Sequence, residues 1–166
     1  MKGNTVKDVS FILEFTRHVL ANGTAPNGDR DRFQRDSTGK LIWEQSWWYS
    51  AFNTAIELSR MRGIKAADIH MNLTVEADTE LYKRRYGEDK FRTHEAIMPG
   101  TQVTFEAMVS DQITESNLTV ILERMGTYVG LSPYGYRLGY GKFNVIEVSV
   151  APSDSGSIND SENSDS

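Results

Sequence analysis

The order of strand and helix patterns constrains the fold of this chain more than any other feature. An apolar run over residues 9–20 (VSFILEFTRHVL) predicts a long strand. Ser46 then offers an N-cap to a helix predicted over 47–62, and Gly63 is placed to end that helix. The apolar stripe of this helix is predicted from residues at helical spacing: Trp48, Phe52, Ala55 and Leu58. Alternation over 69–75 predicts another strand. The first half of the chain is thus predicted to be a strand–helix–strand unit.

The second half repeats this order. Alternation over 101–109 predicts a strand, Thr114 opens a helical pattern, and an alternating run over 143–150 predicts the last strand. Two split βαβ units define the ferredoxin-like arrangement. We therefore expect an α+β, ferredoxin-like βαββαβ fold with an antiparallel sheet and two helices on one face. A charged insertion over 76–100, with a strand near 91–98, is expected to form an inserted β-hairpin region.

Composition sets the limits of the domain. The chain has 166 residues, enough for one domain with its own core, and we expect residues 1–150 to form it. Residues 151–166 (APSDSGSINDSENSDS) hold four of the five net negative charges and little to bury, which predicts a disordered acidic tail. With no cysteine, no apolar run long enough to span a bilayer and no secretory signal, we expect a cytoplasmic protein without a membrane partner.

Glycine and tyrosine are crowded into the stretch 126–150 (GTYVGLSPYGYRLGYGKFNVIEVSV). Glycine allows close backbone approach, and rings beside cations hold a nucleotide chain by stacking and phosphate contact. The alternative is that the glycines supply only tight turns between a helix and a strand. No GxGxxG or GxxxxGK[ST] motif occurs, so nucleotide hydrolysis is not indicated. The predicted nucleic-acid-binding residues here are Tyr134, Gly135, Tyr136, Arg137, Gly139, Tyr140, Gly141 and Lys142.

Two basic clusters could extend that surface. The long polar loop over 22–39 carries Arg30, Arg32 and Arg35, and the insertion carries Lys83, Arg84 and Arg85 between two tyrosines, Tyr82 and Tyr86. We expect both segments to lie beside the glycine-rich loop and to follow a nucleic-acid backbone. The alternative is that each is an ordinary solvated face.

Two segments resemble the RAMP superfamily, the ferredoxin-like proteins from which CRISPR effector complexes and guide-processing ribonucleases are built. The segment 35–42 (RDSTGKLI) looks like the RD-x-x-G…I segment before the first helix of the backbone subunits. The segment 121–145 (ILERMGTYVGLSPYGYRLGYGKFNV) is similar to the terminal glycine-rich loop of the superfamily. The resemblance implies a compact, divergent RAMP-like protein, encoded by a phage and acting in the host cytoplasm.

The resemblance also suggests catalytic candidates. A RAMP-type ribonuclease uses a histidine general base, for which His94 is placed near the basic insertion. In some backbone subunits an aspartate of the first loop supports metal-dependent cleavage, which points to Asp29, Asp31 and Asp36. The alternative for His94 is a structural histidine, and the alternative for the aspartates is an ordinary role in turns. We favour the structural alternative in each case. We expect no bound metal and no cofactor.

The resulting prediction is a non-catalytic module that binds single-stranded RNA or DNA, as an oligomer or within a larger nucleoprotein complex. One alternative is a RAMP-type endoribonuclease. Another is a phage protein-binding factor with no nucleic-acid ligand. Salt-dependent binding of labelled strands would support the nucleic-acid-binding module, and cleavage of RNA would support the endoribonuclease.

Overall fold

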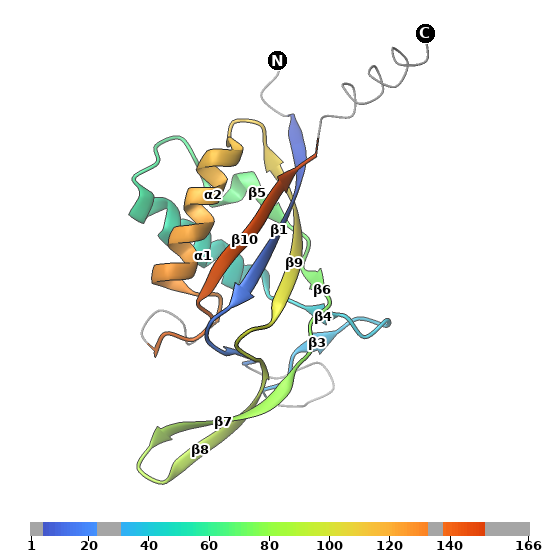
Figure 1. Ribbon diagram of the computed structural model, residues 1–166, viewed down its shortest axis with the longest axis vertical. Coiled ribbons are helices and arrows are strands. Elements are labelled where there is room, and N and C mark those ends of the chain that lie inside the picture. Colours follow the sequence, from blue (N-terminus) through green and yellow to red (C-terminus); the bar gives the residue numbers. More distant parts are fainter. Residues whose placement is uncertain (1–4, 23–30, 133–137, 152–166) are drawn as a thin grey trace.

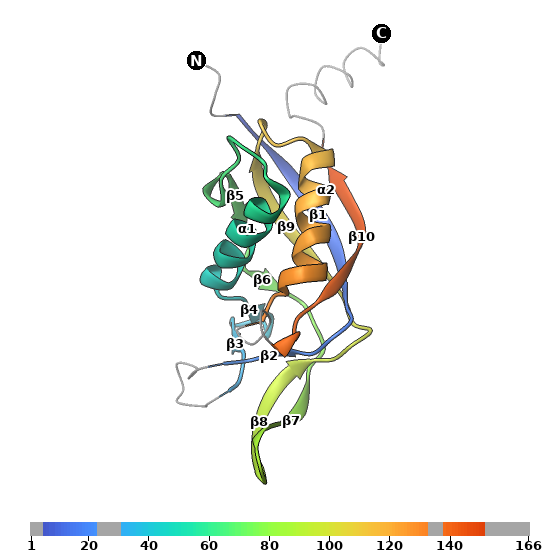
Figure 2. The ribbon, with the colours of Figure 1, turned by 90° about the vertical axis from the view of Figure 1, so that its left-hand side faces the viewer.

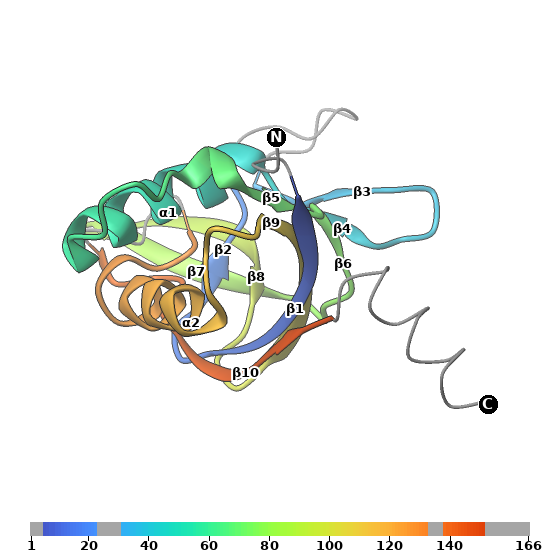
Figure 3. The same cartoon turned by 90° about the horizontal axis from the view of Figure 1, so that it is seen from above.

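The computed structural model describes residues 5–22, 31–132 and 138–151. A four-stranded antiparallel sheet in the order β10–β1–β9–β5 forms the centre, and α1 and α2 cover one of its faces (Figures 1, 2 and 3). The elements are β1 (Val6–Phe15), α1 (Gln45–Ser59), β5 (Ile69–Met71), β9 (Gln102–Ser110), α2 (Glu115–Arg124) and β10 (Phe143–Val150). The order of the four core strands is that of the ferredoxin-like fold, which confirms the predicted α+β class.

The core lies between the sheet and the helices because alternate strand residues face the helices. Phe11 and Phe105 are opposite one another on β1 and β9, and both are buried. The Trp48 ring of α1 packs edge-on against Phe105, with centroids 5.0 Å apart. Phe52 continues the predicted apolar stripe of α1, whereas Leu58, also predicted on that stripe, is 45% exposed near the helix end.

Two strands predicted as continuous are broken. β1 ends at Phe15, the chain bends at 16–18, and β2 (Val19–Leu20) pairs with β8 (Lys90–Ile97) in another sheet. Similarly, 69–75 divides into β5 and β6 (Thr74–Val75). The apolar alternation continues through each break because the strand before it and the strand after it are both partly or fully buried. The two strands nevertheless belong to different sheets.

A third small sheet receives β6. It has the order β3–β4–β6, and β3 (Gln34–Arg35) forms a tight hairpin with β4 (Leu41–Ile42). β3 lies within the segment 22–39 that was predicted as loop, and β4 follows that segment. The Trp43 N–H donates to the Leu73 carbonyl (2.7 Å), which ties this sheet to the entry of α1.

The ends of α1 differ from the predicted ones. Glu44 occupies the N-cap position without a side-chain hydrogen bond, so Ser46 lies inside the first turn and does not cap the helix. At the other end, Arg60 adopts the left-handed conformation (φ 54°) and its N–H donates to the Glu57 and Ile56 carbonyls. The helix therefore ends at Ser59, three residues before the predicted end at 62, because a non-glycine residue takes the capping conformation.

The insertion forms a β-hairpin, as predicted. β7 (Glu80–Gly87) pairs antiparallel with β8, and the two strands project beyond the central sheet (Figures 1 and 2). α2 continues into a π-helical turn, η2 (Met125–Val129), which leads to the glycine-rich loop before β10. Among the described helices, none is both long and apolar enough to cross a membrane. The predicted tail beyond residue 151 lies outside the described residues, and the boundary of the domain stays a prediction.

The N-cap of α2 provides a test of the local fold. The Asn117 N–H donates to Thr114 Oγ1 (3.0 Å), as the sequence predicted for Thr114. We expect Thr114→Ala to lower the free energy of unfolding in urea by about 1 kcal/mol. Glu44→Ala, at an N-cap without a side-chain bond, should change it by less than about 0.5 kcal/mol. Equal losses in the two variants would contradict a specific capping role for Thr114.

Candidate nucleic-acid interface

Backbone hydrogen bonds anchor the base of the glycine-rich loop. The Leu131 N–H donates to the Gly141 carbonyl (2.9 Å), and the Gly141 N–H donates to the His18 carbonyl (2.7 Å). The Thr16 N–H donates to the Lys142 carbonyl (2.9 Å). The first bond closes the base of the loop on itself, and the other two join the loop to the bend that follows β1.

Two glycines are required by this close approach. Gly130 has φ 85°, and a Cβ there would lie 2.5 Å from the Tyr140 carbonyl oxygen. Gly141 has φ 76°, and a Cβ there would lie 2.7 Å from the Leu131 carbonyl carbon. Both positions favour glycine for packing of chain against chain. The tight-turn alternative thus explains these two glycines.

Three rings from three segments meet beside the loop. The His18 ring, from the bend, lies 3.9 Å from the Tyr82 ring of β7, centroid to centroid. The Tyr140 ring, from the loop, lies 6.3 Å from His18 and 6.2 Å from Tyr82. The Arg17 guanidinium lies 5.3 Å from the centroid of Tyr140. The predicted proximity of hairpin and glycine-rich loop is therefore present, with a cation on the aromatic cluster.

Burial and neighbouring groups shift the pKa values of two members of this aromatic cluster, His18 and Tyr140. Burial lowers the pKa of His18, and the charge of Arg17 lowers it further, so the imidazole is neutral at pH 7. Burial raises the pKa of Tyr140, and the nearby Tyr82 hydroxyl, 3.5 Å from that of Tyr140, raises it further. Arg17 therefore supplies the positive charge of the cluster at neutral pH.

The same face of the hairpin continues toward its turn. Arg84 and Tyr86 follow Tyr82 at strand spacing, and Arg92 pairs with Arg84 across the hairpin. Arg84 is buried, and its guanidinium lies 5.7 Å from the Tyr86 centroid. A groove of about 570 Å³ lies here. It is lined by Asp31, Arg32, Arg84, Tyr86, Phe91, Arg92 and Thr93. We define the cationic–aromatic interface as Arg17, His18, Tyr82, Arg84, Tyr86, Arg92 and Tyr140.

Two of the predicted cations face the other way. Lys83 alternates with Arg84 and lies 4.7 Å over the Phe91 ring. Arg85 Nε donates to the Gly87 carbonyl (3.1 Å). Strand alternation thus separates Lys83 and Arg85 from Arg84, and the structure does not bring the whole basic triplet onto one surface.

Two ion pairs fasten the first loop to the hairpin. Asp31 accepts from Arg92 Nε (2.5 Å) and Nη2 (2.8 Å). Glu95 pairs with Arg35 and also accepts from Thr79 Oγ1 (2.6 Å) and the Phe33 N–H (2.8 Å).

The partners of Glu95 decide its ionisation. Burial alone would raise the pKa of Glu95, but its hydrogen bonds from Arg35, Thr79 and Phe33 outweigh burial and lower it. Arg35, predicted to contact phosphate, is therefore held by a carboxylate.

His94 is a structural residue. Its side chain is fully buried, with Nδ1 2.7 Å from the Ala21 carbonyl and Nε2 accepting from Arg84 Nε (3.1 Å). Burial lowers its pKa, which keeps the ring neutral at pH 7. Both ring nitrogens are engaged, so the geometry favours the structural alternative over a general base.

The described aspartates of the first loop also have structural partners. Asp36 Oδ1 accepts from the N–H groups of Thr38 (2.9 Å) and Lys40 (3.0 Å), closing the β3–β4 turn. Asp31 is buried against Arg92. Within the described ranges, no group of three or more His, Cys, Asp or Glu side chains could hold a metal ion. The turn alternative is therefore favoured for Asp36. Asp31 is instead the carboxylate partner of Arg92, a structural ion pair that the sequence did not predict.

Several predicted residues lie outside the described residues. They are Asp29, Arg30, Tyr134, Gly135, Tyr136 and Arg137. Conversely, the sequence reasoning missed Arg17 and His18, which were read as part of a continuous strand. A polar Thr-Arg-His triplet inside an otherwise apolar run was the available signal of a break.

Comparison with known proteins identifies the fold only. No family model matches the chain, and no curated protein matches it. A solved structure, the cryo-EM structure of the Type III-B Cmr-beta bound to cognate target RNA, contains a similar chain with a TM-score of 0.57 and 11% sequence identity. The match covers 87% of this chain and 60% of that chain. At this identity the similarity shows a shared fold alone, and the RAMP resemblance and the phage origin stay predictions.

The Glu95 cluster should stabilise the attachment of the hairpin. We expect Glu95→Ala to lower the free energy of unfolding by about 2–3 kcal/mol, because it leaves Arg35 and the Phe33 N–H without their acceptor. The control is Glu76→Ala, which removes an exposed pair with Lys40 at 4.0 Å and should cost less than about 0.5 kcal/mol. Equal effects in urea denaturation would contradict the assigned role of Glu95.

Acidification should destabilise the protein through its buried histidine. The unfolded chain binds a proton near pH 6.5, whereas folded His94 has a lowered pKa, so stability is lost as the pH falls through 6.5. Below 6.5 the loss is up to about 1.4 kcal/mol per pH unit, until the pKa of the folded state is reached. We expect His94→Gln to show a smaller change in unfolding free energy between pH 7.5 and 5.5 than the unaltered chain. An unchanged pH dependence would show that other groups dominate.

Proposed function

We propose that this protein binds single-stranded RNA through the cationic–aromatic interface, as a non-catalytic module of a larger nucleoprotein complex. The observation that supports this most is the meeting of three separate segments in that surface. The bend after β1 contributes Arg17 and His18, the glycine-rich loop contributes Tyr140, and the hairpin contributes Tyr82 and Arg84. Rings next to guanidinium groups suit a strand whose bases stack while its phosphates meet cations.

The surface is suited to a strand and not to a small ligand. Its residues follow the hairpin from the aromatic cluster toward the turn, and Tyr86 near the turn is 56% exposed. An extended array of rings and cations, rather than an enclosed cavity, is typical of proteins that follow a nucleic-acid backbone. RNA is favoured over DNA because the RAMP-like fold is shared with a chain of a Cmr-beta structure that contains target RNA.

A second candidate, cleavage of RNA, is favoured by one observation. His18 is neutral at pH 7 and lies beside Arg17 and Tyr140, so a base, a cation and a hydroxyl are close together. A neutral imidazole can accept a proton from a ribose hydroxyl. His18 is therefore a better candidate than His94 for the general base of a ribonuclease.

Binding of labelled RNA tests the proposal. We expect a fluorescein-labelled 20-nucleotide single strand to bind at 50 mM salt, and three phosphate contacts would reduce affinity about 20-fold at 200 mM. Arg17→Ala should weaken binding about threefold to tenfold, and Tyr86→Ala about fivefold or more. Fluorescence anisotropy measures both.

The chain offers a matched control for each variant. Arg62, between α1 and η1 (Ala66–Asp68), carries the same charge as Arg17, and Tyr49 on α1 is 50% exposed, close to Tyr86. Arg62→Ala and Tyr49→Ala should change affinity less than twofold. Binding that is absent, insensitive to salt or equally affected by the controls would overturn the proposal. Shortening of the RNA that His18→Ala abolishes would favour the ribonuclease candidate, and tighter binding of the DNA strand would reassign the ligand.

A further inference from the structure

The sheet face that lies opposite the helices is a second, chemically different surface. In each strand, buried residues that face the helices alternate with residues that point outward onto this face. We define the open sheet face as Asp8, Ser10, Ile12, Glu14, His70, Thr104, Glu106, Met108, Glu147 and Ser149.

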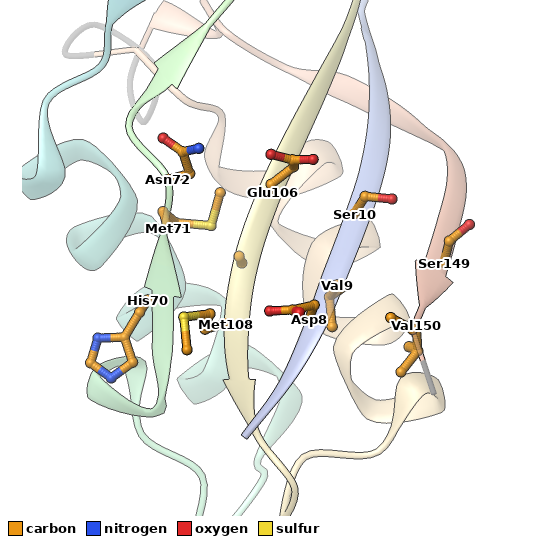
Figure 4. A pocket seen from close by; sticks show the side chains of 12 residues that line it. Asp8, Val9, Ser10, His70, Met71, Asn72, Glu106, Met108, Ser149 and Val150 are labelled. Carbon is orange, nitrogen blue, oxygen red and sulfur yellow. The ribbon is translucent and has the colours of Figure 1, made fainter. Parts of the chain in front are cut away.

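This face is hollowed. A depression of about 710 Å³ spans the four strands, and Figure 4 shows Asp8, Ser10, Glu106 and Met108 arranged around it. Met108 lies in the middle, opposite Asp8 on β1 and His70 on β5, and is 48% exposed. An apolar side chain is thus presented in a shallow concavity with a carboxylate on the next strand.

The charge of the open sheet face has one sign at neutral pH. It holds four carboxylates, from Asp8, Glu14, Glu106 and Glu147, and no lysine or arginine of the described strands lies on it. Lys7, the one lysine within these four strands, is on the other face, where its ammonium donates to the Ile113 carbonyl. Within the described residues, none of the four carboxylates forms an ion pair.

Such a surface is unsuited to nucleic acid. Phosphates are repelled by carboxylates, and no Phe, Tyr or Trp of the described strands points outward on this face to stack a base. The cationic–aromatic interface has the opposite properties, so the two surfaces select different partners.

We infer that the open sheet face docks a basic amphipathic segment of a partner protein. Lysine or arginine side chains of that segment meet Asp8 and Glu106, while an apolar side chain of the segment packs on Met108. Charge complementarity across a rim and an apolar contact at the centre are the usual anatomy of a protein interface. The inference extends beyond RNA binding and does not depend on it.

A designed peptide tests this inference. The probe is a fluorescein-labelled 18-residue peptide of lysine and leucine at heptad spacing, and the control peptide carries glutamate in place of lysine. We expect the basic peptide to bind the full chain and the acidic one not to bind. Chemical-shift changes in the full chain should concentrate on the amides of β1, β9 and β5.

Charge-reversal variants locate the contact. Glu106→Lys should weaken peptide binding at least tenfold, and Met108→Ala should weaken it about threefold. Glu123→Lys, an equal reversal at an exposed position of α2, should change it less than twofold. Circular dichroism verifies that each variant is folded.

The outcomes separate this inference from the proposed function. Glu106→Lys and Glu123→Lys should have the same small effect on RNA binding, so loss of peptide binding alone identifies the open sheet face. Equal loss in both variants, or shift changes confined to the helices, would overturn the inference. Self-association of the chain that Glu106→Lys abolishes would overturn it as well, by making a second copy the occupant.

Discussion

The hydrogen bond from the Gly141 N–H to the His18 carbonyl joins the parts of the molecule on which the candidate interface depends. It fixes the bend after β1 against the base of the glycine-rich loop, and the bend carries Arg17 outward while His18 stacks on Tyr82. The glycine-rich loop therefore contributes to the interface first by shaping the backbone and only then through Tyr140.

Charge pairing decides which basic residues remain available to a ligand. Arg35 and Arg92 have carboxylate partners, Glu95 and Asp31, from a segment remote in sequence. These pairs position the hairpin relative to the domain, so a count of basic residues in the first loop and the insertion overstates the cations exposed for phosphate. Arg92 still lines the groove, and pairing with Asp31 fixes where its guanidinium lies.

The sequence predicted the features that local chemistry determines. Helix periodicity identified Trp48 and Phe52 as core, Thr114 was recognised as an N-cap, and the strand 143–150 was found with its correct ends. The bend at 16–18 was missed, and so was the left-handed Arg60, because each depends on a contact or conformation that apolar spacing does not encode. For the site, Tyr140 and Arg84 were predicted, whereas Arg17 and His18 required the tertiary structure.

Charges of opposite sign lie on the two surfaces, so the molecule has a polarised charge distribution despite its small net charge. The cationic–aromatic interface lies at the hairpin and the glycine-rich loop, and the carboxylates lie on the outward face of the sheet. If the proposed function holds, a negatively charged strand is attracted to the first surface and repelled from the second, so the field orients its approach before any base stacks. A basic protein segment experiences the reverse field. Both partners could thus be held at once, because neither competes for the surface that the other requires.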